Sequence, residues 1–249
     1  MTVRGEDLAA ALDRLLEEQN SLTRLLLWAR RDGHPAIVEA WLDPKSIAET
    51  DATEWKPHDR DKPARGAGPW RLAGDWAWAL LIPQLEAAGL SVTAVALPSV
   101  GGEGDLAADA AVVRAALAEL DGPAILVGRS YGGIVTSEAA TAETVAHLVY
   151  VCAFLLPVGV SVLDALNHQI PPWISVDEPA GVSRALTPET VFYGDVPQDL
   201  IDAAVPRLTT QTLSSFATPH TPAAWEDLPS TYVICDEDRA LPSPTQEAM

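Results

Sequence analysis

The fold is decided by one stretch of the sequence, Ala124-Ile125-Leu126-Val127-Gly128-Arg129-Ser130-Tyr131-Gly132-Gly133. Four apolar residues begin it, as in a buried strand of a parallel sheet. A G-x-S-x-G sequence follows, and a helical pattern then continues to about Ala142. A direct turn from strand to helix is so tight that its central residue, Ser130, takes a strained backbone conformation. Gly128 and Gly132 leave room where a Cβ would collide with neighbouring backbone.

The predicted turn gives Ser130 a particular chemical environment. Its hydroxyl is expected above the carboxyl edge of the sheet, with the N-terminus of the following helix pointing toward it. The positive end of the helix dipole and the first N–H groups then face any oxyanion that forms there. A glycine-rich turn with an unreactive surface serine is the alternative, and the strand before and the helix after Ser130 argue against it. Ser130 is therefore the candidate nucleophile.

Apolar segments on both sides of this stretch extend the same pattern. Strands without polar alternation are predicted at 90–97, 147–154 and 231–235. Helical spacing occurs over 76–88, and a further helix is predicted from its capping residue Asp105 to Leu120. Buried strands separated by helices are typical of an α/β fold, in which a mostly parallel sheet carries helices on both faces.

A long segment without a clear strand, about 155–228, separates two of the predicted strands. It contains several prolines and two short helical patterns, at 162–167 and 197–205. A helical insertion of this length between two sheet strands is expected to form a lid over a site. After one more strand the chain ends at Met249, which is early for such a sheet.

The N-terminal part of the sequence lacks this alternation of apolar strands and helices. From 7 to 31 the leucines recur with helical spacing, which fits either an amphipathic helix packed on its own domain or a short dimerising coiled coil. An apolar run of uncertain type follows at 36–42, and 43–67 is a polar, proline-containing linker. We therefore expect an N-terminal helix and linker over 1–65 and the α/β domain over 66–249.

Composition excludes several classes of protein. The 249 residues are 48% apolar and 20% charged, which suits one large domain with a substantial core and not a disordered chain. No apolar run is long enough for a membrane-spanning helix. The formal net charge of −19 argues against nucleic-acid binding, and we expect no membrane partner.

Other signals are absent from the sequence. No metal-ligand spacing, phosphate-binding glycine loop or dinucleotide fingerprint occurs, so neither a metal nor another cofactor is expected. Nothing at the N-terminus resembles a signal peptide, and a cytoplasmic location is expected. Cys152 and Cys235 lie in apolar runs and are interpreted as buried small hydrophobes rather than as a disulfide framework.

From about Gly74 to Met249 the sequence resembles the α/β-hydrolase superfamily, in particular the branch of plant methyl esterases, hydroxynitrile lyases and their bacterial esterase-like relatives. Five segments in the family's order carry the resemblance: 76–89, 96–98, 126–133, 148–155 and 231–242. The resemblance implies an α/β-hydrolase fold and a triad in the chain order serine, acid, histidine. It assigns Ser130 as nucleophile, Asp238 as acid and the backbone N–H of Tyr131 as oxyanion donor.

The sequence departs from the family in two places. No histidine occurs in the eleven residues after Asp238, where the family has its general base, so the domain is expected to be incomplete at its C-terminal end. The histidines present are His34, His58, His147, His168 and His220. At the N-terminal end, the stretch 56–68 is polar and basic and has no apolar strand before it, and 65–68 is only a weak candidate for the family's His-Gly turn, which donates the second oxyanion N–H.

Three functions are compatible with these observations. The first is a serine hydrolase that cleaves a small carboxylic ester through an acyl-enzyme on Ser130, if a base is supplied. The second is a non-catalytic ligand-binding or interaction protein on the same fold, since the family histidine is absent. The third, a hydroxynitrile lyase-like activity, shares the triad but is disfavoured by Tyr131, which replaces the small residue expected after the serine.

Overall fold

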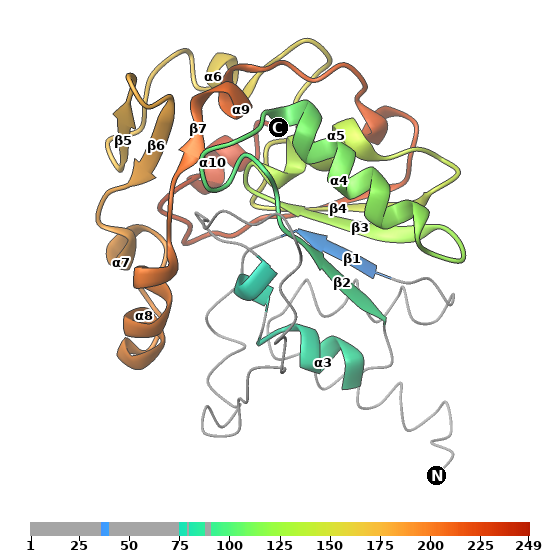
Figure 1. The fold of residues 1–249 in the computed structure, drawn as a ribbon, viewed down its shortest axis with the longest axis horizontal. Coiled ribbons are helices and arrows are strands. Elements are labelled where there is room, and N and C mark those ends of the chain that lie inside the picture. Colours follow the sequence, from blue (N-terminus) through green and yellow to red (C-terminus); the bar gives the residue numbers. More distant parts are fainter. Residues whose placement is uncertain (1–35, 40–74, 79, 88–90) are drawn as a thin grey trace.

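The structure, a computed structural model, describes residues 36–39, 75–78, 80–87 and 91–249 (Figure 1). The N-terminal helix predicted over 7–31, the dimer contact it would make and the polar linker all lie outside the described residues. The description below therefore concerns the sheet, its covering helices and the segment inserted before the last strand.

A five-stranded sheet forms the centre of the described region, with strand order β2-β1-β3-β4-β8 and all neighbours parallel. The predicted α/β fold with a mostly parallel sheet is confirmed. The strands are β1 (Ala36–Glu39), β2 (Val92–Val95), β3 (Ala124–Arg129), β4 (Val145–Val151) and β8 (Ser230–Val233).

Helices cover both faces of this sheet (Figure 1). On one face lie α4 (Leu106–Ala118) and α5 (Gly132–Ala139), and on the other lie a 3-10 turn, η3 (Asp75–Trp78), and α3 (Ile82–Ala87). The carboxylate of Asp105 accepts a hydrogen bond from the N–H of Ala108, so the predicted helix cap is present. No helix in the described ranges combines the length and apolar character that crossing a bilayer requires.

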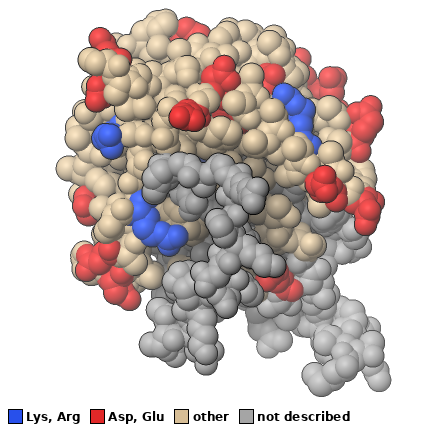
Figure 2. Space-filling model, in the orientation of Figure 1, with Lys and Arg blue, Asp and Glu red and all other residues tan. Residues whose placement is uncertain are grey.

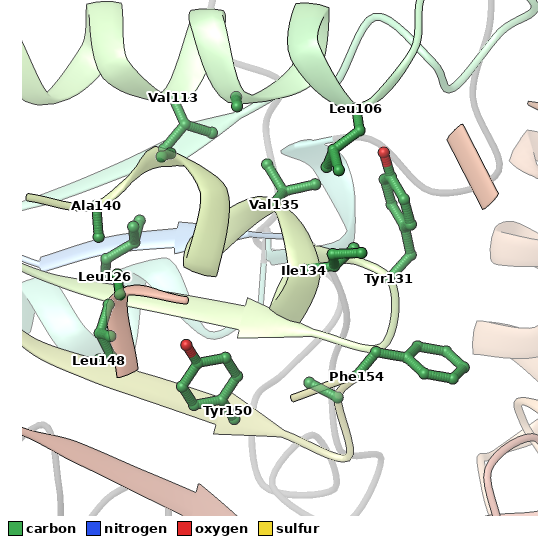
Figure 3. Packing of buried hydrophobic residues seen from close by; sticks show 14 of the residues in the cluster. Leu106, Val113, Leu126, Tyr131, Ile134, Val135, Ala140, Leu148, Tyr150 and Phe154 are labelled. Atoms are coloured by element: carbon green, nitrogen blue, oxygen red, sulfur yellow. The ribbon is translucent and has the colours of Figure 1, made fainter. Parts of the chain in front are cut away.

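The strand side chains alternate between two hydrophobic clusters, one on each face. Leu126, Leu148 and Tyr150 pack beneath α4 and α5 (Figure 3), whereas Ile125 and Val149 face the opposite cluster around Trp78. Because both faces of β3 are buried, this strand needs no polar position before Arg129, which explains its apolar sequence. Most acidic side chains of the described region instead lie on its surface, as Figure 2 shows for one face.

β1 occupies a central place that the sequence pattern did not reveal. It is formed by the apolar run of uncertain type and pairs with both β2 and β3, with Val38 opposite Ala94 and Val127. Four residues are too few to distinguish a strand from a helix by periodicity. The sheet therefore includes residues from the part of the chain, 1–65, in which we expected a helix and linker.

The inserted segment is not purely helical, and the expectation that 155–228 holds no strand is wrong. Three strands, β5 (Ile174–Asp177), β6 (Val182–Ala185) and β7 (Gln211–Thr212), form a small antiparallel sheet. Their residues are mixed in polarity and in burial, and β7 is polar although it is buried, so the three strands lack an apolar run. The helical pieces of the segment are α6 (Val162–Ala165), α7 (Pro188–Val191), α8 (Gln198–Ala204), η4 (Val205–Arg207), α9 (Leu213–Ala217) and η5 (Ala224–Glu226), and α10 (Ser243–Gln246) follows β8.

A buried hydrogen-bond network ties α4 to the turn after β3. Asp109, in α4, accepts hydrogen bonds from the N–H of Ser99 at 2.8 Å and from the hydroxyl of Tyr131 at 2.8 Å. Its side chain is fully buried. Burial raises the pKa of Asp109 above its ordinary value, although the hydrogen bonds from Ser99 and Tyr131 oppose the shift.

We predict that Gly128→Ala destabilises the protein by about 3 kcal/mol, because the new side chain overpacks the turn. A Cβ at this position would lie 2.5 Å from the carbonyl oxygen of Gly132 and would also meet the hydroxyl of Thr136. Urea unfolding measures the effect. The control is Gly181→Ala, where a Cβ meets nothing within 4 Å and only the positive φ of +68° costs about 1 kcal/mol. Equal losses for the two variants would contradict the overpacking argument.

The Asp109→Asn variant should change how stability depends on pH. Because the pKa of Asp109 is higher in the folded protein than in the unfolded chain, the wild type loses stability as pH rises from about 4 through the raised value. The asparagine side chain of the variant does not titrate, so the wild-type stability minus that of the variant should fall with rising pH over this window and then level off. Urea unfolding at a series of pH values measures this difference, and a difference that is constant or increases would contradict the assignment.

Candidate active site

Ser130 has the strained backbone that the sequence predicts at this turn. Its φ of +53° lies in the left-handed region, which non-glycine residues rarely adopt. Hydrogen bonds hold it on both sides: its N–H donates to the carbonyl of Val151 at 3.4 Å, and its own carbonyl accepts from the N–H of Gly133 at 3.1 Å and of Phe154 at 2.9 Å. The end of β4 thus fixes the turn between β3 and α5.

A cavity of about 390 Å³ opens above this turn. Ser130, Tyr131, Gly132 and Asp238 all line it, so four of the residues singled out from the sequence share one site, whereas Gly128 lies in β3 beneath the turn. Most of the wall is apolar and comes from the strand ends, the turn and the inserted segment. Large apolar side chains in the wall include Leu97, Phe154, Leu166, Trp173, Phe192 and Phe216. The charged lining residues are Arg129, Glu178, Arg184 and Asp238.

Asp238 is held by the chain that follows it. One carboxylate oxygen, Oδ1, accepts hydrogen bonds from the N–H of Ala240 at 2.7 Å and of Leu241 at 3.0 Å. Oδ2 makes no hydrogen bond with the residues that the structure describes. The side chain is partly exposed and lies in the wall of the cavity that Ser130 also lines. One acceptor oxygen thus remains for a further donor.

Arg129 is the site residue that the sequence analysis did not single out. It lines the cavity directly before Ser130 and lies close to Asp238 and to the thiol of Cys152. Burial alone would lower the pKa of Arg129, but Cys152 and Asp238 raise it, and the net shift is upward. The guanidinium is therefore held in its charged form. A charged residue at the end of an otherwise apolar strand is the sequence signal that could have identified it.

Tyr131 stands at the start of α5, where the backbone N–H groups of the first helical turn point out of the helix. Its side chain is fixed away from the backbone by the hydrogen bond to Asp109 and by an edge-to-face contact with Phe216, with ring centres 5.6 Å apart. This arrangement holds the peptide after Ser130 in one orientation. The weak candidate for a second oxyanion turn, 65–68, lies outside the described residues.

No histidine among the described residues lines the cavity. His147 is in β4, where its Nε2 lies 2.9 Å from the hydroxyl of Thr231, and burial lowers its pKa. His168 is exposed and lies 3.2 Å from the carboxylate of Asp164. Neither is positioned to take a proton from Ser130.

His220 has a different structural role. The side chain is fully buried, and its two ring nitrogens lie 2.8 Å from the carbonyl oxygen of Pro222 and 2.9 Å from that of Pro157. These contacts join the beginning and the end of the inserted segment. The other two histidines, His34 and His58, lie outside the described residues. The described part of the site therefore contains the predicted serine and acid but no base.

Known proteins resemble this chain in sequence and in fold. The alpha/beta hydrolase nvfD of Aspergillus novofumigatus (strain IBT 16806) is 33% identical over 138 residues, which are 50% of this chain and 55% of that protein. The chain thus spans about half the length of this curated relative. The solved structure of PytH, described as a pyrethroid hydrolase, is 26% identical in sequence, with a TM-score of 0.63. The match covers 72% of this chain and 80% of PytH.

A third likeness concerns the fold alone. A methylesterase from Arabidopsis is 22% identical, with a TM-score of 0.56 over 70% of this chain and 78% of that one. Residues 64–249 match the alpha/beta hydrolase family as a whole, and this range includes β2, β3, β4 and β8, the helices α4 and α5 and every described residue of the cavity wall. The chain therefore belongs to the α/β hydrolase family.

Proposed function

We propose that this protein is a serine hydrolase that cleaves a carboxylic ester through an acyl-enzyme on Ser130. The observation that carries the proposal is the left-handed backbone of Ser130, at the start of α5 and facing the cavity that also contains Asp238. A strained serine between a buried strand and a helix is the arrangement that nucleophilic serines have in this fold. The hydrolases among the related proteins add support.

The reaction has two stages. The Ser130 Oγ attacks the ester carbonyl carbon while its proton passes to a base, and collapse of the tetrahedral intermediate expels the alcohol, which takes up a proton. Water then attacks the acyl group in the same way, releasing the acid and restoring the serine. Negative charge on the carbonyl oxygen is stabilised by the Tyr131 N–H and the N-terminal end of α5.

The cavity favours an apolar substrate of moderate size. Its volume of about 390 Å³ lies in the range of small-molecule sites, and aromatic and aliphatic side chains form most of the wall. An ester binds there mainly by burying apolar surface, and the few polar groups beside Ser130 orient its carbonyl.

The second candidate is a binding protein without turnover. Its support is the absence of a histidine from the cavity wall among the described residues. A serine hydroxyl without a base is a weak nucleophile at neutral pH, so such a protein binds a ligand and does not cleave it. Activity measurements on the same purified chain distinguish the two candidates.

We predict that Ser130→Ala abolishes labelling by a fluorophosphonate probe and lowers ester turnover by about 10³-fold, because both require the Oγ nucleophile. Peptide mapping of the labelled protein identifies the modified residue. Ser214→Ala is the matched control, since Ser214 is exposed, its hydroxyl donates only to the carbonyl of Gly104 among the described residues, and it is not in the cavity wall. Ester cleavage that survives Ser130→Ala would overturn the proposal. Binding without labelling in the folded wild type would favour the binding protein.

Added imidazole should accelerate fluorophosphonate labelling of Ser130 on the order of ten-fold, because it supplies a base beside the serine. Asp238→Asn should reduce this acceleration, since the carboxylate no longer orients the imidazole or stabilises its charged form. The asparagine in this variant retains the Oδ1 acceptor for the two N–H groups that the aspartate now binds. Asp236→Asn, at an exposed position two residues earlier, is the control. Equal acceleration in Asp238→Asn and the wild type would exclude Asp238 as the acid.

A further inference from the structure

The two cysteines lie side by side at the carboxyl edge of the sheet. Cys152 follows the last residue of β4, and Cys235 comes two residues after the end of β8. The two strands are parallel neighbours, with Val151 opposite Val233, and the N–H of Cys152 donates to the carbonyl of Val233 at 2.9 Å. Both cysteines are reduced thiols, Cys152 buried and Cys235 partly exposed.

A strained backbone turns Cys152 toward its neighbour. In a regular strand successive side chains point to opposite faces, so Cys152 should face away from Val151. Its φ of +37° is in the left-handed region, however, and Val151 and Cys152 both pack in the cluster around Trp78. Cys235 contacts the same cluster. The strain at Cys152 therefore brings both thiols to one face of the sheet.

Hydrogen bonds hold the backbone on either side of this pair. The hydroxyl of Tyr232 donates to the carbonyl of Ala153 at 2.7 Å and accepts from its N–H at 3.0 Å. The side chain of Gln246, itself buried, accepts from the N–H of Cys235 at 2.9 Å and donates to its carbonyl at 3.2 Å. Both cysteine backbones are therefore fixed, which limits the entropy lost when their side chains are joined.

The two thiols also interact with each other and with a charge. A hydrogen bond to Cys235 and burial raise the pKa of Cys152 well above its ordinary value, whereas the Arg129 guanidinium opposes this shift. No group of three or more potential metal-ligating side chains occurs in the described part of the chain, so nothing there suggests a metal site at the thiols. Proximity and fixed backbones favour joining the two sulfurs, whereas the raised pKa of Cys152 leaves the first attack on an oxidant to the more exposed Cys235.

We propose that Cys152 and Cys235 form an oxidation site at which a hydroperoxide converts the two thiols into an intramolecular disulfide. Cys235, the more exposed residue, loses its proton to water and attacks the peroxide oxygen, giving a sulfenic acid and an alcohol, or water from hydrogen peroxide. The sulfur of Cys152 then attacks Sγ of Cys235, and the sulfenic oxygen leaves as water with the thiol proton. Two electrons pass from the thiols to the peroxide, and a dithiol reductant reverses the reaction.

The test treats the reduced 249-residue chain with stoichiometric hydrogen peroxide and measures intact mass, thiol content and peptide linkage. We expect the loss of two hydrogen atoms and of both titratable thiols, a single cross-linked peptide pair containing Cys152 and Cys235, and full recovery with dithiothreitol. Oxygen addition to separate sulfurs without the cross-link, or a disulfide only between two chains, would overturn the proposal. This result does not depend on ester cleavage.

Single variants test the order of the two steps. Cys152→Ser leaves Cys235 without a resolving thiol, so dimedone should trap its sulfenic acid in most molecules. Cys235→Ser retains only the buried thiol and should give a dimedone adduct at least ten-fold more slowly. Equal trapping in the two variants would contradict the assignment of Cys235 as the thiol attacked first. The wild-type cross-link tests the site itself even if a variant fails to fold.

Discussion

The turn at Ser130 is the constraint on which the rest of the described structure depends. The chain passes from β3 into α5 without a loop, and this is possible only because position 128 has no Cβ and Ser130 accepts a left-handed backbone. Two hydrogen bonds to the end of β4 hold the strained residue in place. The direction of α5, the open cavity above it and the packing of α4 follow from this turn.

Although the chain is strongly acidic, the wall of the cavity contains an interacting pair of opposite charges, Arg129 and Asp238. Most carboxylates lie in water, where their mutual effects are weak. Arg129 and Asp238 both line a mostly apolar cavity, where charges interact more strongly, and Asp238 raises the pKa of Arg129. Arg129 is also the group that connects the two chemical sites. It lines the cavity beside Ser130 and lies close to Cys152 on the other side.

The sequence predicted the longer apolar strands and the capped helix and missed the strands that are very short or mixed in polarity. The apolar runs of β3 and β4 and the cap at Asp105 can be recognised from a few neighbouring residues alone. The order of the family's motifs identified Ser130 and Asp238, which line one cavity in the structure. β1 is too short to show a period, and the antiparallel strands of the inserted segment are two to four residues long and mixed in polarity. The left-handed backbone of Cys152 leaves no sequence signal, because cysteine is not a residue type that favours a positive φ.

The same hydrogen bonds connect the two strained residues at the carboxyl edge of the sheet, Ser130 and Cys152. Ser130 and Cys152 each follow the last residue of a strand, both have positive φ, and the strands β3 and β4 are neighbours. Ser130 binds the carbonyl of Val151 immediately before Cys152 and the N–H of Phe154 two residues after it. A conformational change at Cys152 must therefore either be absorbed within this short segment or move the backbone that fixes Ser130. Since strain of this kind persists only where the surroundings over-determine it, a change in the backbone of Cys152 is expected to reach the hydrogen bonds that Ser130 makes with Val151 and Phe154.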